Sequence, residues 1–176
     1  MKKLWIPLAA LLVSTPVTAQ MNHGDAASLA GIRALNETAR GYITAAAEQV
    51  TEANFAFKPT PEVRSFGQLL GHVANSGYAF CAGATGEKAP TVPNAEKLAT
   101  KAEIVSALKA SFAYCDKAYA MDAMRLGEKL DFFGQPHTRL SVLAFNMGHN
   151  FEHYGNIVTY MRLKGMVPPS SMPGGN

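Results

Sequence analysis

The sequence lacks the features that mark several large classes of protein. It has two cysteines and one tryptophan among 176 residues, and only 16% of its residues are charged. Cys81 and Cys115 are too far apart for a Cys-x-x-Cys redox pair, a zinc ribbon or the Cys-x-x-Cys-His site that attaches haem. Cytochromes of the c type, some of which are helical bundles, are therefore excluded.

Clusters of lysine and arginine are also missing. The formal net charge is +3, and it falls to +1 when Lys2 and Lys3 at the extreme N-terminus are left out. A nearly neutral chain without a basic stripe has no electrostatic footprint for a polyanion. We therefore expect a small-molecule substrate of unknown identity and no nucleic-acid partner. The oligomeric state stays open, a homodimer included.

The chain has one markedly apolar run, Leu4 to Val13, and it is too short for a permanent transmembrane helix. Lys2 and Lys3 precede it, and the small-residue pattern Val17-Thr18-Ala19 follows it. This order is typical of a secretory signal peptide over residues 1–19. We expect cleavage after Ala19 and a periplasmic or secreted protein with no membrane contact after cleavage. An uncleaved membrane anchor is the alternative.

Apolar residues recur at helical spacing in four segments of the remaining chain. These segments are about 26–49, 65–83, 100–124 and 138–164. No segment reads as a convincing strand, and residues 130–135 read as a turn region. The pattern predicts an all-α protein, a four-helix bundle over residues 20–167, with a flexible tail over 168–176.

Three histidines stand where helices would hold the ligands of one metal ion. His149 and His153 are four residues apart on the fourth predicted helix, and His72 lies on the second. Side chains four apart share one helix face, and a third imidazole from another helix would leave coordination positions open. The alternative is that all three are neutral core histidines with satisfied hydrogen bonds.

The fourth predicted helix carries two apolar stripes. One is an ordinary core stripe; the other contains the two histidines and is more polar. The first consists of Leu140, Ala144, Met147, Phe151, Tyr154 and Val158. The second consists of Val142, Asn146, His149, His153, Ile157 and Tyr160. We expect the first stripe to face the core and the helix to be well buried as a whole.

Polar neighbours of the histidines are candidates for orienting them. Asn75, Asn146 and Glu152 each lie within three residues of a histidine, and ligating imidazoles commonly donate their second N–H to such groups. The alternative is that both asparagines bridge helices and Glu152 faces solvent. His137, beside a proline in the turn region, is expected at the surface.

The string His149-Asn150-Phe151-Glu152-His153 also matches the His-x-x-Glu-His motif of inverted zinc peptidases. Those enzymes need an acidic ligand further along the chain. No acidic residue follows His153, so the peptidase interpretation is weak.

Two longer segments resemble the DinB-like superfamily: FGQLLGHVANSGY over residues 66–78 and FNMGHNFEHYGNIVTYMRLKGMVPP over residues 145–169. The resemblance extends over most of the chain after Ala19. It implies a bundle with up-down-down-up order, and a divalent metal, zinc or nickel, held by His72, His149 and His153. Members of that superfamily with an assigned activity are mostly thiol-dependent transferases or isomerases. Our first hypothesis is therefore a metal-dependent enzyme, a thiol-dependent transferase or a hydrolase, in which Glu152 is the candidate for proton transfer.

Two other functions remain open beside the exported metalloenzyme. One is a non-catalytic metal-binding or stress-related helical binding protein, and the other is a helical interaction module without metal. The implied parallel second and third helices would place Cys81 and Cys115 at similar heights. A disulfide between them is therefore predicted, and it would contribute roughly 3–4 kcal/mol.

Overall fold

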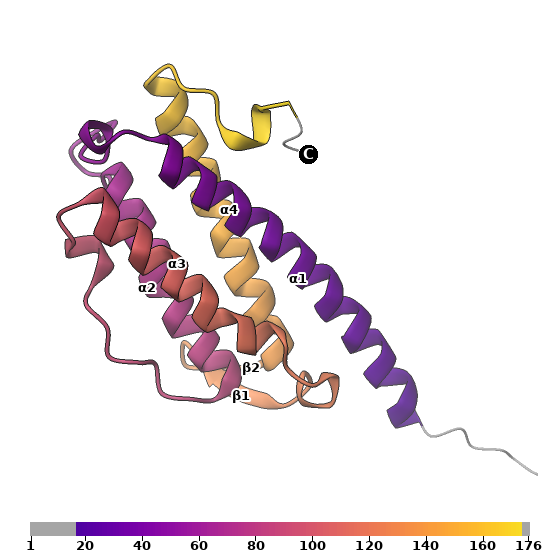
Figure 1. Cartoon of the computed structure of the whole chain (residues 1–176). Helices are drawn as coiled ribbons and strands as arrows, with labels where there is room; N and C mark the ends of the chain where they lie inside the picture. Colours follow the sequence, from indigo (N-terminus) through magenta and orange to yellow (C-terminus); the bar gives the residue numbers. More distant parts are fainter. Residues whose placement is uncertain (1–16, 174–176) are drawn as a thin grey trace, which may run out of the picture.

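Four long helices account for most of the chain in this computed structural model, which describes residues 17–173. The helices are α1 (Val17–Gln49), α2 (Phe66–Thr85), α3 (Lys101–Tyr119) and α4 (Arg139–Leu163). α1 is the longest, and its N-terminal part extends beyond the other three helices (Figure 1). The all-α bundle expected from the periodicity is confirmed.

Local signals in the sequence account for most helix ends. Ser65, Thr100 and Thr138 begin α2, α3 and α4, and each exchanges hydrogen bonds with the third residue of its helix in a capping box. α2 ends at Gly86 and α4 is followed by Gly165, and both glycines have the positive φ that closes a helix.

Contacts between helices define their directions. Cys81 of α2 is disulfide-bonded to Cys115 of α3, with the Cα atoms 5.3 Å apart, as predicted. Earlier in both helices, the backbone oxygen of Ala74 accepts a hydrogen bond from Ser111. Residues later in α2 therefore contact residues later in α3, so the two helices run parallel.

α4 runs against α2 and along α1. Its residue His149 contacts His72, whereas Phe145, one turn earlier, contacts Phe80, which lies later in α2. In α1, Asn36 bonds Asn150 and Gln49 bonds the backbone of Val167. The helix directions are thus up, down, down and up in chain order.

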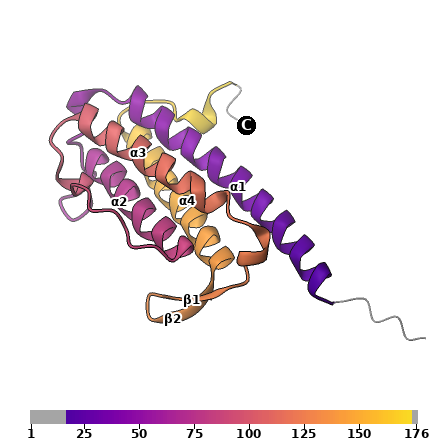
Figure 2. The same ribbon diagram turned by 60° about the horizontal axis from the view of Figure 1, so that its bottom comes forward.

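Three differences from the sequence-based expectations concern short segments. The turn region contains an antiparallel hairpin, β1 (Lys129–Phe132) and β2 (Gln135–Thr138), which covers one end of the bundle (Figure 2). α3 ends at Tyr119, five residues before the expected end. α1 begins at Val17, and residues 1–16 of the expected signal peptide lie outside the described residues.

The segment expected to form the tail, residues 168–176, is described as far as residue 173. It includes a 3-10 helix, Pro169–Ser171, in which Pro169 is buried and Ser170 bonds the hydroxyl of Tyr154. Pro168 and Pro169 restrict the backbone of this segment. The hydrogen bonds between Ser170 and Tyr154 tie it to α4. Among residues 17–173, no helix is long and apolar enough to cross a membrane.

The interior consists of two apolar clusters, one toward each end of the bundle. Between them lies a belt of buried polar side chains contributed by all four helices. The belt consists of Asn36, Ser76, Ser111, Asn146, Asn150 and His153. Buried polar groups are costly unless they are bonded, and hydrogen bonds between helices satisfy Ser111, Asn146 and Asn150.

Candidate metal centre

His72 reaches the polar belt because of how α2 packs against the loop that follows it. Gly71 lets the backbone of Ala95 approach so closely that a Cβ at position 71 would lie 2.5 Å from the Ala95 carbonyl. Ala95 begins a short 3-10 helix, Ala95–Lys97, which carries Glu96. The Glu96 carboxylate therefore lies against the imidazole of His72, with Oε1 3.1 Å from Nδ1.

His149 and His153 occupy adjacent turns of α4. His153 is buried and His149 is partly buried, together with Asn146, Asn150 and Ile157 on the same face. The expectation for this helix was therefore wrong about which stripe forms the core. The stripe that contains the histidines is the buried one, and of the other stripe only Tyr154 is buried.

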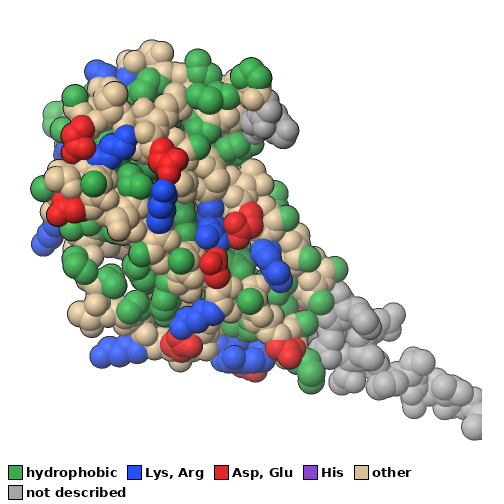
Figure 3. Space-filling model, in the orientation of Figure 1, with side chains coloured by type: hydrophobic (Ala, Val, Ile, Leu, Met, Phe, Trp, Pro, Cys, Tyr) green, Lys and Arg blue, Asp and Glu red, His purple; other side chains and the backbone are tan. Residues whose placement is uncertain are grey.

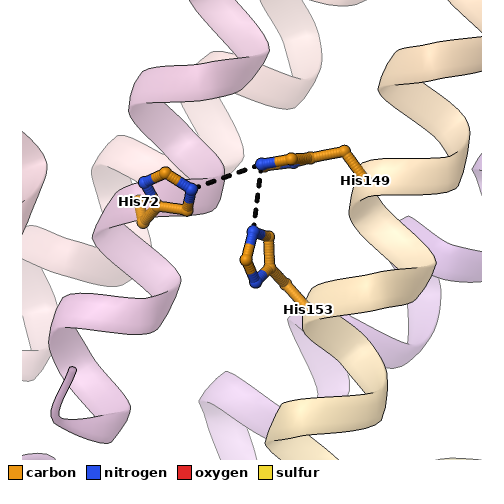
Figure 4. A group of neighbouring side chains, drawn as sticks. All are labelled: His72, His149 and His153. Atoms are coloured by element: carbon orange, nitrogen blue, oxygen red, sulfur yellow. Dashed lines mark hydrogen bonds between the residues drawn. The ribbon is translucent and has the colours of Figure 1, made fainter. Parts of the chain in front are cut away.

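The three imidazoles point their Nε2 atoms at one another from α2 and α4 (Figure 4). Nε2 of His149 lies 3.3 Å from Nε2 of His72 and 3.0 Å from Nε2 of His153. Nitrogens bound to one zinc ion at about 2.0–2.1 Å are about 2.9–3.4 Å apart at tetrahedral to octahedral angles. These two distances match the spacing of ligands around a single ion, and all three ligand atoms lie within 4.8 Å of one another.

The proton positions favour a cation at this point as well. When the Nδ1–H of His72 donates a hydrogen bond to the Glu96 carboxylate, the Nε2 atom of the same ring presents a lone pair to His149. Nε2 of His149 cannot donate to both neighbours, and its own Nδ1 is buried without a partner. A divalent ion among the three Nε2 atoms would satisfy lone pairs that otherwise face each other, so the donor set fits a metal.

Burial and neighbouring charges favour the neutral, metal-binding form of His149 and His153. Burial, followed by the nearby His153 and His72, lowers the pKa of His149 to about 3. Burial and His72 also lower the pKa of His153. Burial acts to raise the pKa of Glu96, but hydrogen bonds from Arg64 and His72 outweigh it and lower the pKa. Glu96 is thus a carboxylate at neutral pH.

The other polar candidates fall outside this constellation. Asn75 bonds Asn94 and the backbone of Ala95, so it holds the loop rather than a histidine. Asn146 bonds the hydroxyl of Tyr119 and bridges α4 to α3. His137 is partly buried rather than fully exposed, and its Nδ1 lies 3.3 Å from Oγ of Ser141.

Glu152 is exposed and makes no hydrogen bond or ion pair within residues 17–173. Its negative charge acts on His153, where it opposes part of the effect of burial on the pKa. The side chain lines the same cavity as His153. Glu152 and His153 therefore share one wall of that cavity.

That cavity reaches the candidate metal centre at His153, the one histidine of the three in its lining. Its volume is about 680 Å³, and it opens between the start of α2, the 3-10 helix at Glu96 and the second half of α4. Its polar walls include Lys58, Arg64, Glu96, Glu152, His153, Asn156 and Tyr160. An aromatic group lies on the other side of His149, where Phe80 and Phe145 contact the ring.

Sequence reasoning missed Glu96 and Arg64. Both are polar residues outside the four predicted helices, and Glu96 lies 24 positions from His72, so no periodicity connects them. The available signal was the pair of glycines, Gly67 and Gly71, one turn apart in α2, which mark a close approach of another segment. The approaching segment itself was not identifiable.

The comparisons with known proteins agree with this fold. The family model for the DinB superfamily matches residues 35–157. The crystal structure of a DinB-like protein from Bacillus cereus ATCC 10987 is similar, with a TM-score of 0.68 at 18% identity, over 79% of this chain and 94% of that one. The crystal structure of a DinB-like protein from Bacillus subtilis is also similar, with a TM-score of 0.61 at 20% identity. The match covers 78% of this chain and 93% of that one. No curated protein matches the sequence.

Proposed function

Since the chain belongs to the DinB superfamily, we propose that it is an exported metalloenzyme that binds zinc, nickel or a similar divalent ion through His72, His149 and His153. The observation that carries the proposal is the convergence of three Nε2 atoms within 4.8 Å of one another. When bound, the ion supplies a Lewis acid for a transferase or hydrolase reaction. The Cys81–Cys115 disulfide and the lack of a membrane-crossing helix among residues 17–173 are compatible with export.

The chain's own groups have distinct tasks in this proposal. Glu96 orients His72 and keeps its Nε2 free of a proton. His153 forms part of the cavity wall, so a ligand in the cavity reaches the histidines from that side. Glu152, exposed on the same wall, takes or returns a proton at its carboxylate oxygen. The aromatic rings around His149 limit access of water from the opposite side.

The cavity favours an enzyme over a purely structural metal site. Structural zinc sites are closed by four protein ligands, whereas among residues 24–173, whose side chains the structure describes, three histidines converge here. A non-catalytic metal-binding protein is the alternative, and it predicts that no substrate is turned over even when the metal is bound.

A substrate screen with three forms of the protein tests the proposal. Thiol-transfer and ester or amide hydrolysis substrates are incubated with metal-loaded protein, with chelator-stripped protein and with a metal-loaded Glu152→Gln variant. Turnover that is lost on stripping and reduced at least about 100-fold in the variant supports the enzyme. Full metal occupancy without turnover of any substrate would support the binding protein instead.

A further inference from the structure

Arg64 has two donor groups that the fold does not use. Its Nε donates to Oε2 of Glu96 at 3.0 Å, and its side chain is 44% exposed. Its backbone oxygen accepts a hydrogen bond from Tyr160, which fixes the main chain at this point. Within residues 17–173, neither terminal nitrogen of the guanidinium makes a hydrogen bond or ion pair. Glu96 thus holds the guanidinium in place while its two terminal amino groups remain free.

The free end of Arg64 belongs to the same cavity as the metal centre. Arg64, Glu96 and His153 all line the cavity of about 680 Å³. The charge of Arg64 also reaches the histidines, where it adds to burial in lowering the pKa of His149 and His153. A ligand that contacts the metal site from this cavity therefore meets the guanidinium at the same time.

The charges around the cavity favour an anion at the Arg64 end. Its lining includes two cations, Lys58 and Arg64, and three carboxylates, Glu62, Glu96 and Glu152. Glu96 pairs with Nε of Arg64, and its other oxygen lies 3.1 Å from Nδ1 of the His72 ring. Hydrogen bonds from its own backbone and from Thr60 hold the Glu62 carboxylate. Lys58 makes no ion pair among residues 17–173. A divalent ion bound by neutral imidazoles tips the balance to a positive excess.

We infer that the substrate of this site carries an anionic oxygen group, a carboxylate or a phosphate, which Arg64 and Lys58 bind beside the metal centre. The inference rests on the proposed function, because it assigns the group to the substrate of the same site. Arginine binds two oxygens of a carboxylate or phosphate in parallel, and this geometry orients as well as attracts the ligand. Arg64 therefore positions the rest of the substrate relative to the histidines.

Calorimetric titration of metal-loaded protein with succinate and, separately, with inorganic phosphate tests the inference. The parent is expected to bind one of the two, and an Arg64→Gln variant to bind it about 10-fold or more weakly. The stronger of the two probes identifies the anion class. Arg125→Gln is the matched control, because Arg125 also donates through Nε to a glutamate and its side chain is 47% exposed, but it lies outside this cavity. The Arg125→Gln variant should bind the anion with the same affinity as the parent.

Metal content is measured on every variant, which separates the two proposals. A parent without metal contradicts the proposed function. A metal-loaded parent that binds neither anion overturns the inference alone, as does Arg64→Gln with unchanged affinity. Since Arg64→Gln also releases Glu96, Lys58→Gln is a second variant that leaves the pair with Glu96 intact. The Lys58→Gln variant is expected to bind the anion about 3-fold or more weakly than the parent. Unchanged anion affinity in a metal-loaded Lys58→Gln variant would contradict the inference that Lys58 and Arg64 bind the anion together.

Discussion

At the scale of single residues, Glu96 determines which nitrogen of His72 faces the other two histidines. Its carboxylate lies 3.1 Å from Nδ1 and is itself held by Arg64. Carboxylates in this position raise the basicity of the ligand and fix its orientation. Arg64 and Glu96 together hold the ring of His72, whereas Nδ1 of His149 is buried without a hydrogen-bond partner.

Replacing Glu96 with alanine should lower metal affinity about 10- to 100-fold, because His72 loses both its orientation and the nearby negative charge. Competition with a chromogenic chelator measures the change. Glu87→Ala serves as the control, because Glu87 pairs with Lys117 on the surface. Equal affinities in the two variants would show that Glu96 has no part in the site.

The lowered pKa of His149 also makes a prediction for protein without metal. Its folded pKa of about 3 lies below the ordinary value of 6.5, so the unfolded state binds more protons below pH 6.5. The stability contributed by the neutral ring is present above that pH and is lost progressively as the pH falls. The melting temperature in chelator should therefore drop between pH 7.5 and pH 5.

A His149→Gln variant should show a smaller drop over the same interval, because one of the depressed titrations has been removed. Circular dichroism melts at matched ionic strength give both slopes. Identical slopes in the two proteins would mean that His149 does not titrate differently on folding.

At the scale of elements, the packing of the 3-10 helix Ala95–Lys97 onto α2 brings Glu96 to His72. The contact depends on Gly71, where an added Cβ would lie 2.5 Å from backbone atoms of Ala95. Backbone cannot move aside as a flexible side chain can, so any substitution at Gly71 must shift the 3-10 helix.

Gly71→Ala should therefore lower the free energy of unfolding by about 1–3 kcal/mol and weaken metal binding as well. Gly148→Ala is the control, since a Cβ at this α4 position, next to His149, meets nothing within 4 Å. That change should raise the free energy of unfolding by about 0.5–1 kcal/mol. Chemical denaturation and the chelator assay measure both effects. A Gly71→Ala variant with parental stability and affinity would argue against the close approach.

Sequence patterns predicted the helices better than the face that each helix buries. Capping residues such as Ser65 and Thr100 are local, so the beginnings of α2 and α3 were predictable. The buried face of α4 was not, because at the level of the polar belt it carries Asn146, Asn150 and His153, and apolarity pointed to the neighbouring stripe. The hairpin was missed because each strand has four residues and its turn places Phe133 at a positive φ that usually selects glycine or asparagine.

The candidate site was predictable to a similar extent. His149 and His153 share a helix, so their spacing alone indicated a common face. His72 was added by its place on a second helix and by the family resemblance. Glu96 and Arg64 depend on how a loop packs, which is a property of the tertiary structure and leaves no periodic signal.

At the scale of the whole molecule, the disulfide and the metal centre lie on different pairs of helices. Cys81–Cys115 joins α2 to α3, whereas the histidines join α2 to α4. Helix α2 is thus the common element, with the disulfide on one side and the candidate metal centre on the other. The face shown in Figure 3 carries acidic and basic side chains interspersed with apolar ones.

Reduction of the disulfide should lower the free energy of unfolding by roughly 3–4 kcal/mol, because it removes a cross-link over 34 residues from the unfolded chain. Metal affinity should stay within about 3-fold of the parent, since α2 and α4 remain packed. Denaturation with and without reductant tests this, and a Cys81→Ala/Cys115→Ala variant should not respond to reductant. A large loss of metal on reduction would show that the two links are coupled.

The most direct test of the metal centre is metal content by mass spectrometry on untagged protein, beside a His149→Ala/His153→Ala variant. The account predicts nearly one equivalent of a divalent transition metal in the parent and almost none in the variant. A parent free of metal, with a melting temperature unchanged by added zinc or nickel, would contradict it and leave the three histidines as part of a polar core.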